Sequence, residues 1–181
     1  MQSRAQLFDS RQQVRREAYA AFFSSVEQAR AAMGSAHSVW TEYHRSLGPL
    51  AGRVSVVGGG HEEAREAVRE AVKALWFQQS LLRLSVTGVE RQTADSLVGQ
   101  VVGVMRCFEV WCAALERGDP PIELDRRFMM RSGELADTVV HVMETAKGWL
   151  DGNPELDPPR QRLWQRFWSR YHDRRFRSVD P

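Results

Sequence analysis

The chain has 181 residues, of which 43% are hydrophobic and 27% charged, a balance typical of a globular domain that can bury a core. The formal net charge of +2 is divided unevenly, because residues 1–159 carry 18 Lys and Arg against 21 Asp and Glu, whereas residues 160–181 carry seven Arg against two Asp. The two cysteines, Cys107 and Cys112, lie roughly 140° apart on a helix, which excludes a disulfide between them. We expect both to behave as small buried hydrophobic residues in a reducing compartment.

The first predicted element is a long helix over residues 4–47, a stretch with no proline and with Gly34 as its single glycine. Apolar residues recur in it at spacings of three and four, which is the pattern of one buried helix face. These residues are Phe22, Val26, Ala29, Met33, Ala36, Trp40, Tyr43 and Leu47. An unbroken helix of this length would be roughly 65 Å long. It must therefore bend near Gly34 or extend its first turns beyond its neighbours.

Three further helices are predicted over residues 61–87, 90–117 and 124–150, each with an apolar stripe along one face. The second helix follows a linker that ends in three glycines. Its predicted apolar face consists of Ala64, Ala67, Val68, Ala71, Leu75 and Leu82. The predicted inward face of the fourth helix consists of Leu135, Val139, Val142, Met143, Ala146 and Leu150.

These elements predict an all-α fold, an up-down antiparallel four-helix bundle with a long first helix. The bundle would occupy residues 1–150, followed by a linker rich in proline and acidic residues over 151–159. A C-terminal amphipathic basic helix or tail would occupy residues 160–181.

The third predicted helix has two notable features. Gly99 and Gly103 are four residues apart, and two small residues at this spacing predict a close crossing with another helix. Its long apolar stretch, residues 97–115, is interrupted by polar and charged residues, so we do not expect it to span a membrane.

Few side chains are placed for chemistry. His44 falls on the apolar stripe of the first helix and Glu109 at the edge of the third, so a buried His–Glu pair is one candidate site, although a satisfied core histidine is the commoner outcome. Asp137, His141 and Glu144 share one face of the fourth helix at a spacing that a metal site can use. That face lies opposite the apolar stripe, which favours a solvated surface. We find no catalytic constellation and predict a protein that is not an enzyme and needs no metal or cofactor.

The C-terminal segment is the strongest candidate for a binding site. On a helical wheel its apolar residues occupy an arc of about 140°, and three arginines form a stripe beside them. The candidate binding residues are Arg162, Trp164, Arg166, Phe167, Trp168, Arg170 and Tyr171.

Several interpretations of this segment compete. The favoured one is a fifth helix packed on the bundle, because an aromatic stripe at helical spacing is more often core than interface. A basic helix with Trp and Phe on one face also suits an anionic membrane surface. Arginines with exposed aromatic residues suit a nucleic acid, and an amphipathic helix can also enter a groove on a protein partner.

The sequence Arg15-Arg16-Glu17-Ala18-Tyr19-Ala20-Ala21-Phe22, followed by a Val-Ser-Val-Val-Gly stretch and an Ala/Glu-rich helix, resembles a set of uncharacterised helical proteins of high-GC actinobacteria. The resemblance covers about the first two-thirds of the chain and implies a cytoplasmic helical bundle. It brings no catalytic residue with it, and the basic aromatic segment is not part of it.

The sequence therefore predicts a non-enzymatic helical interaction or assembly module that self-associates through the long first helix. The expected partner is a second copy or another protein, and no small-molecule substrate is inferred. The alternative is a peripheral binder of nucleic acid or anionic membrane that uses residues 160–177.

Overall fold

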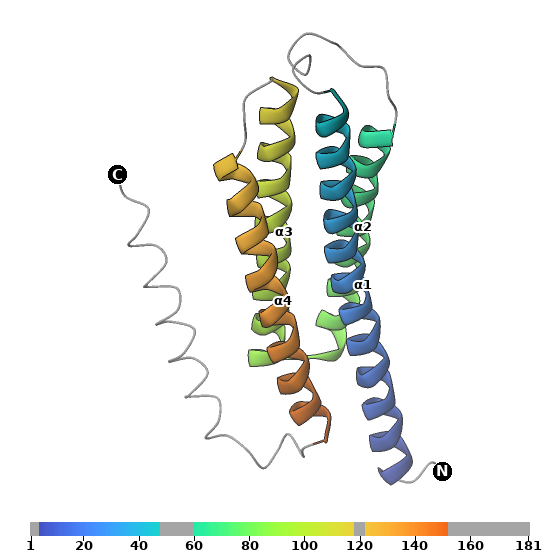
Figure 1. Ribbon diagram of the computed structural model, residues 1–181. Helices are drawn as coiled ribbons and strands as arrows, with labels where there is room; N and C mark the ends of the chain where they lie inside the picture. The colour runs from blue at the N-terminus through green and yellow to red at the C-terminus, as the bar shows by residue number, and fades with distance from the viewer. Residues whose placement is uncertain (1–3, 48–59, 118–121, 152–181) are drawn as a thin grey trace. The chain divides into compact units, whose positions relative to one another are not determined.

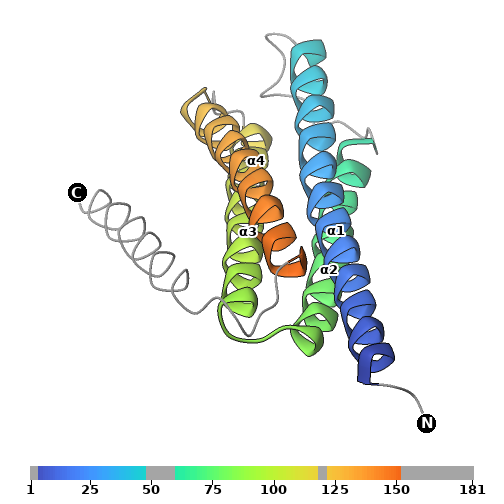
Figure 2. The ribbon, with the colours of Figure 1, turned by 90° about the horizontal axis from the view of Figure 1, so that it is seen from below.

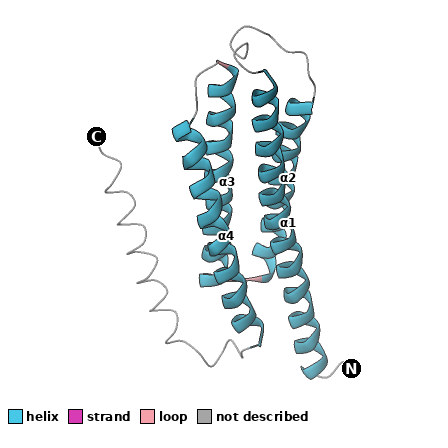
Figure 3. Cartoon of the chain, in the orientation of Figure 1, coloured by secondary structure: helices cyan, strands magenta, loops and turns pink. Residues whose placement is uncertain are grey.

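The computed structural model describes residues 4–47, 60–117 and 122–151, and every element in these ranges is an α-helix (Figures 1 and 3). The predicted all-α class is confirmed for this part of the chain, in which four helices and no strand are found. The predicted linkers at 50–60 and 151–159 fall largely outside the described residues, and the C-terminal helix over 160–181 lies wholly outside them.

The helices are α1 (Arg4–Leu47), α2 (Gly60–Ser85), α3 (Gly88–Glu116) and α4 (Ile122–Asp151). Their ends fall within a few residues of the predicted ones. Two glutamates in the first turn of α2 suit the positive end of the helix dipole. The connection between α2 and α3 is tight, and Gly88 has φ of 55°, a left-handed conformation that favours glycine.

The chain divides into two compact units, residues 1–146 and residues 147–181. In the first unit consecutive helices run in opposite directions, and α1 lies beside α2 in both ribbon views (Figures 1 and 2). α1 continues as a helix through Gly34, and its first turns extend beyond the connection between α2 and α3.

The core is built from the stripes that the sequence predicted. On α1 the predicted residues that are buried are Phe22, Val26, Ala29, Met33, Ala36 and Trp40. They pack with buried residues of the other three helices, among which are Leu75, Leu82, Leu97, Phe108, Trp111, Phe128 and Leu135. Close packing of this kind is the main stabilising contribution in a helical bundle.

Several of the predicted inward positions are wrong or only partly right. Tyr43, Ala64, Ala71 and Leu150 are only half-buried. Met143 is 45% exposed, because it lies about 60° from the centre of the α4 core stripe on a helical wheel. Ala67 is exposed, about 100° from the centre of the α2 stripe. Cys107 is only partly covered, whereas Cys112 is buried as predicted.

The glycine pair on α3 does not mark a close helix crossing. A Cβ atom added at Gly99 or at Gly103 would meet no side chain or other helix within 4 Å. Both residues are helical with negative φ, so an alanine fits the backbone without strain. The predicted close crossing at these positions is therefore wrong.

Replacing either glycine with alanine should stabilise the protein. Glycine in a helix interior costs about 0.5–1 kcal/mol relative to alanine, and neither Gly99→Ala nor Gly103→Ala introduces a contact that would offset the gain. Urea unfolding followed by circular dichroism should show a higher midpoint for each variant. A lower midpoint would mean that another chain or segment packs closely on this face.

α3 is the one helix in the described ranges that is long and apolar enough to cross a membrane by length and composition. Of its 18-residue apolar window, 44% is buried inside the protein. Its buried residues include Leu97, Val101, Phe108 and Trp111, which face the bundle core. That residues 97–115 do not span a membrane stays a prediction.

Candidate functional site

The binding residues nominated in the C-terminal segment lie outside the described residues. They are Arg162, Trp164, Arg166, Phe167, Trp168, Arg170 and Tyr171. The three residues at metal-compatible spacing on α4, Asp137, His141 and Glu144, are all exposed, as the helical wheel indicated. Among the described residues no group of three or more His, Cys, Asp or Glu is placed to hold a metal ion.

The candidate His44–Glu109 pair is not formed. Glu109 instead accepts hydrogen bonds from two arginines of α2, at 2.7 Å from Arg65 Nε and 3.3 Å from Arg69 Nε. Arg65 also donates to Glu116 at 2.9 Å, so one α2 arginine joins two carboxylates of α3. These ion pairs connect α2 to α3 along one side of the bundle.

His44 lies instead among aromatic rings at the end of α1. Its ring lies parallel to that of Trp40 at 6.2 Å and perpendicular to that of Tyr43 at 5.6 Å. Burial, and then the nearby His61, lower the pKa of His44 below its ordinary value. His61 stacks on Tyr43 at 4.8 Å and meets the edge of Trp40 at 4.9 Å. The arrangement is that of a packed aromatic cluster with a neutral histidine.

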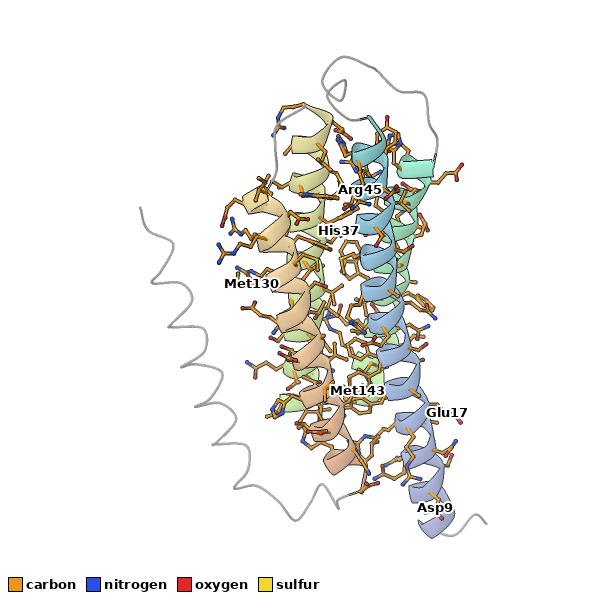
Figure 4. The ribbon with its side chains drawn as sticks, viewed as in Figure 1. Asp9, Glu17, His37, Arg45, Met130 and Met143 are labelled. Carbon is orange, nitrogen blue, oxygen red and sulfur yellow. The ribbon has the colours of Figure 1, made fainter. Side chains whose placement is uncertain are left out.

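A second histidine has a carboxylate partner that the sequence did not indicate. His37, labelled on α1 in Figure 4, places Nε2 2.6 Å from Oδ1 of Asp125 on α4. Its ring is covered by Trp111 of α3 at 4.6 Å and by Phe128 of α4 at 4.9 Å. A His–Asp pair can orient a catalytic base. With Asp125 on Nε2 and the rings of Trp111 and Phe128 against the imidazole, His37 joins α1 to α3 and α4.

The sulfur of Cys112 lies in the interior of the same end of the bundle. Its side chain is fully buried, and burial raises the pKa of the Cys112 thiol to about 12. A thiol with so high a pKa is almost entirely protonated at neutral pH and is a poor nucleophile.

Cys112 should react with thiol reagents only when the protein unfolds. In a Cys107→Ser variant, which leaves Cys112 as the single thiol, labelling by Ellman's reagent at pH 8 should be very slow without denaturant. The rate should rise across the same urea range as the loss of helical circular dichroism. Rapid labelling of the native variant would show that the site opens locally. The matched Cys112→Ser variant should label faster, because Cys107 is partly exposed.

The surface of α2 carries the apolar feature that we regard as the candidate functional site. Four large side chains in its second half are exposed, Trp76 by 47%, Phe77 by 62%, Leu81 by 41% and Leu84 by 85%. Phe77, Leu81 and Leu84 lie on the side of α2 opposite its buried residues, and Trp76 lies beside them. We call these four residues the α2 patch.

Trp76, Phe77 and Leu81 of the α2 patch lie in a run without charge, and Leu84 follows just after it, beyond Arg83. From Ala74 to Leu82 the sequence is Ala-Leu-Trp-Phe-Gln-Gln-Ser-Leu-Leu, in which apolar residues point in every direction around the helix. Leu75 and Leu82 of this run are buried, while Phe77 and Leu81 are exposed. An unusual density of apolar residues was the sequence signal for this surface, but periodicity alone could not separate the two faces.

Exposed apolar side chains also occur on α4, but they are more dispersed. They are Ile122, Met129, Met130, Val140 and Met143, and Figure 4 labels two of these methionines. Apolar residues scattered over a surface need no special explanation, whereas a contiguous patch often marks an interaction site.

No protein-family model, curated protein or solved structure matches this chain.

Proposed function

We propose that this protein is a non-enzymatic helical interaction module that self-associates. The architecture that goes with this proposal is the up-down antiparallel four-helix bundle with a long first helix and a C-terminal amphipathic basic helix. The α2 patch is the observation that carries the proposal, because the largest apolar patch on the surface of a soluble protein often marks an interaction site. His37 and Cys112 support it too, because the imidazole of His37 is paired with Asp125 and the thiol of Cys112 is buried.

The sequence alone placed self-association on the long first helix, and that contact stays part of the proposal. In its favour, Val14 in the first half of α1 is 54% exposed. Asp9 and Glu17, labelled on the same helix in Figure 4, are also exposed, so this surface is mostly polar. The α2 patch therefore offers more apolar area for association than α1 does.

Self-association is tested by sedimentation velocity of the full chain over a wide concentration range. We expect the weight-average mass to rise from that of the 20.7 kDa chain toward twice that value. A constant mass of one chain at every concentration would contradict the proposal. Cytoplasmic location, and kinship with the actinobacterial helical proteins that the sequence resembles, stay predictions.

A second candidate function rests on the composition of residues 160–177, which hold seven Arg, one Asp and five aromatic residues. Such a segment suits nucleic acid or an anionic membrane. Titration of the full chain with single-stranded DNA, RNA or anionic vesicles tests it. Binding should weaken steeply with salt for nucleic acid and follow anionic lipid content for vesicles. Unchanged binding after Arg162, Arg166 and Arg170 are replaced by Glu would contradict both electrostatic forms.

A further inference from the structure

The α2 patch is large enough to be the centre of a protein interface. Large apolar side chains bury about 150–250 Å² each, so the exposed fractions of its four residues leave roughly 400–500 Å² of apolar surface. A stable interface covers about 800 Å² on each partner, with an apolar centre and a polar rim. The patch therefore supplies an apolar centre, and polar residues around it such as Lys73 and Ser80 would form part of the rim.

The charge on the rest of α2 selects the class of partner. Four glutamates on the first half of the helix are exposed on the same side as the patch or beside it. These glutamates are Glu62, Glu63, Glu66 and Glu70. Arg65 pairs with Glu62, Arg69 with Glu66, and Lys73 with Glu66 and Glu70. These pairs leave no excess of positive charge on the face, so it has little attraction for a phosphate backbone or an anionic lipid surface. The face therefore suits a protein surface that is apolar where the patch is and uncharged or basic beyond it.

A second copy of this chain meets these conditions when the two α2 helices run antiparallel. A parallel pair would bring the eight glutamates of two copies together. An antiparallel pair centred between Ser80 and Leu81 overlaps the second halves of the two helices, which hold no acidic residue, and sets Phe77 opposite Leu84 of the second copy. The glutamates of each copy then lie toward the other copy's α2 C-terminus, where Arg91 is exposed and donates to the carbonyl oxygen of Arg83 at 2.9 Å. Antiparallel helix dipoles favour the same arrangement.

We propose that the α2 patch is an isologous interface through which two copies of this chain pair antiparallel about a two-fold axis near Leu81. This inference deepens the self-association proposed above and rests on it. Both copies use the same patch, so the contact closes after two subunits. α1 packs against α2 and so also supports the interface helix.

Sedimentation velocity of the full chain with single charge insertions tests the surface. Leu84→Glu and Phe77→Glu should each raise the dimer dissociation constant at least tenfold, because each places a carboxylate in the apolar centre. The matched control is Ile122→Glu on α4, where a side chain that is 79% exposed receives the same charge and the dimer should persist. Both patch side chains are largely exposed, so circular dichroism melting curves should show that every variant stays folded.

The outcomes distinguish self-association in general from association through the α2 patch. A dimer that survives both patch variants would overturn the α2 interface and leave self-association standing. A wild-type chain that is monomeric at all concentrations would overturn both. Loss of the dimer in Ile122→Glu as well would show that added negative charge, not the patch, is responsible, and would also overturn the α2 interface.

Site-directed cross-linking tests the antiparallel direction. In a Cys107→Ser background, a cysteine at Ser80 lies close to its own copy across the two-fold axis, and a short thiol cross-linker should give covalent dimers. A cysteine at Glu63 would be separated from its copy by about 50 Å along the helix axes in the antiparallel pair, so no cross-link should form. Cross-linking at both positions would show a parallel pair, and cross-linking at neither would overturn the interface.

Discussion

Replacing Trp40 with alanine should lower the free energy of unfolding by about 3–5 kcal/mol, the usual cost of removing a buried aromatic side chain. Trp40 is 1% exposed and is the largest fully buried residue of the described chain. Its ring contacts those of His61 and Trp111, so one side chain fills space between α1, α2 and α3. A domain of this size is stable by about 5–15 kcal/mol, so the change removes a third or more of the total.

The hydrogen bond of Trp40 adds a separate contribution. Its Nε1 donates to the backbone carbonyl oxygen of His61 at 3.2 Å, in the first turn of α2. The Trp40→Phe variant keeps most of the ring but leaves that carbonyl without its donor, and we expect a loss of about 1–2 kcal/mol. Urea unfolding monitored by circular dichroism measures both variants without depending on tryptophan emission.

The matched control is Trp76→Ala, because Trp76 is 47% exposed on α2. At protein concentrations too low for self-association, removing the Trp76 side chain should lower the free energy of unfolding by less than about 1 kcal/mol. Equal losses for Trp40→Ala and Trp76→Ala would contradict the described burial of the two rings.

The buried stripe of α1 shows what the sequence could predict. Phe22, Val26, Met33 and Trp40 recur with the period of a helix, and all four are buried as expected. A repeating pattern encodes burial directly, because one face of a helix meets the core over its whole length. The ends of the helices could also be predicted from the sequence, because glycine and proline interrupt a helix through their local effect on the backbone.

The contacts between helices could not be predicted in the same way. His37 meets Asp125, which is 88 residues away, and this pairing depends on how α4 is rotated and how far it is shifted along its axis. Glu109 pairs with Arg65 of α2 and not with His44 for the same reason. The period of a sequence specifies which face is apolar but not which polar residues at the edges of two faces come together.

The α2 patch was missed for a different physical reason. Trp76, Phe77 and Leu81 are as apolar as the buried Leu75 and Leu82, and all five fall within eight residues. Hydrophobicity does not distinguish a residue that faces the core from one that faces a partner. The distinction appears only when the positions of α1 and α3 beside α2 are known.

Replacing Glu90 with alanine should have the second largest effect, a loss of about 1–3 kcal/mol in the free energy of unfolding. Glu90 of α3 accepts a hydrogen bond from Arg15 of α1 at 2.5 Å, and the two side chains are only 14% and 15% exposed. Removing the carboxylate leaves a guanidinium largely shielded from water without this partner, which is costly. Tyr19 is affected as well, because burial and then the charge of Glu90 raise the pKa of its phenol, which stays neutral.

A double-mutant cycle separates the ion pair from the other contacts of its members. Arg15→Ala and Glu90→Ala should each be destabilising, and the double variant should be more stable than the sum of the two losses implies, because no unpaired charge remains. The matched control is the pair Arg45–Glu42 on α1, whose side chains are 71% and 69% exposed. Glu42→Ala should cost no more than about 0.5 kcal/mol, since exposed pairs are screened by water and salt.

The cycle also tests how the first half of α1 is held. Arg15 lies near the turns of α1 that extend beyond the connection between α2 and α3, and Glu90 lies at the start of α3. If this pair orients the end of α1, hydrogen exchange in the turn around Arg15 should accelerate in Glu90→Ala and stay unchanged in Glu42→Ala. Additive losses in the cycle, with no change in exchange, would mean that apolar packing around Tyr19 and Phe23 alone holds this part of the helix.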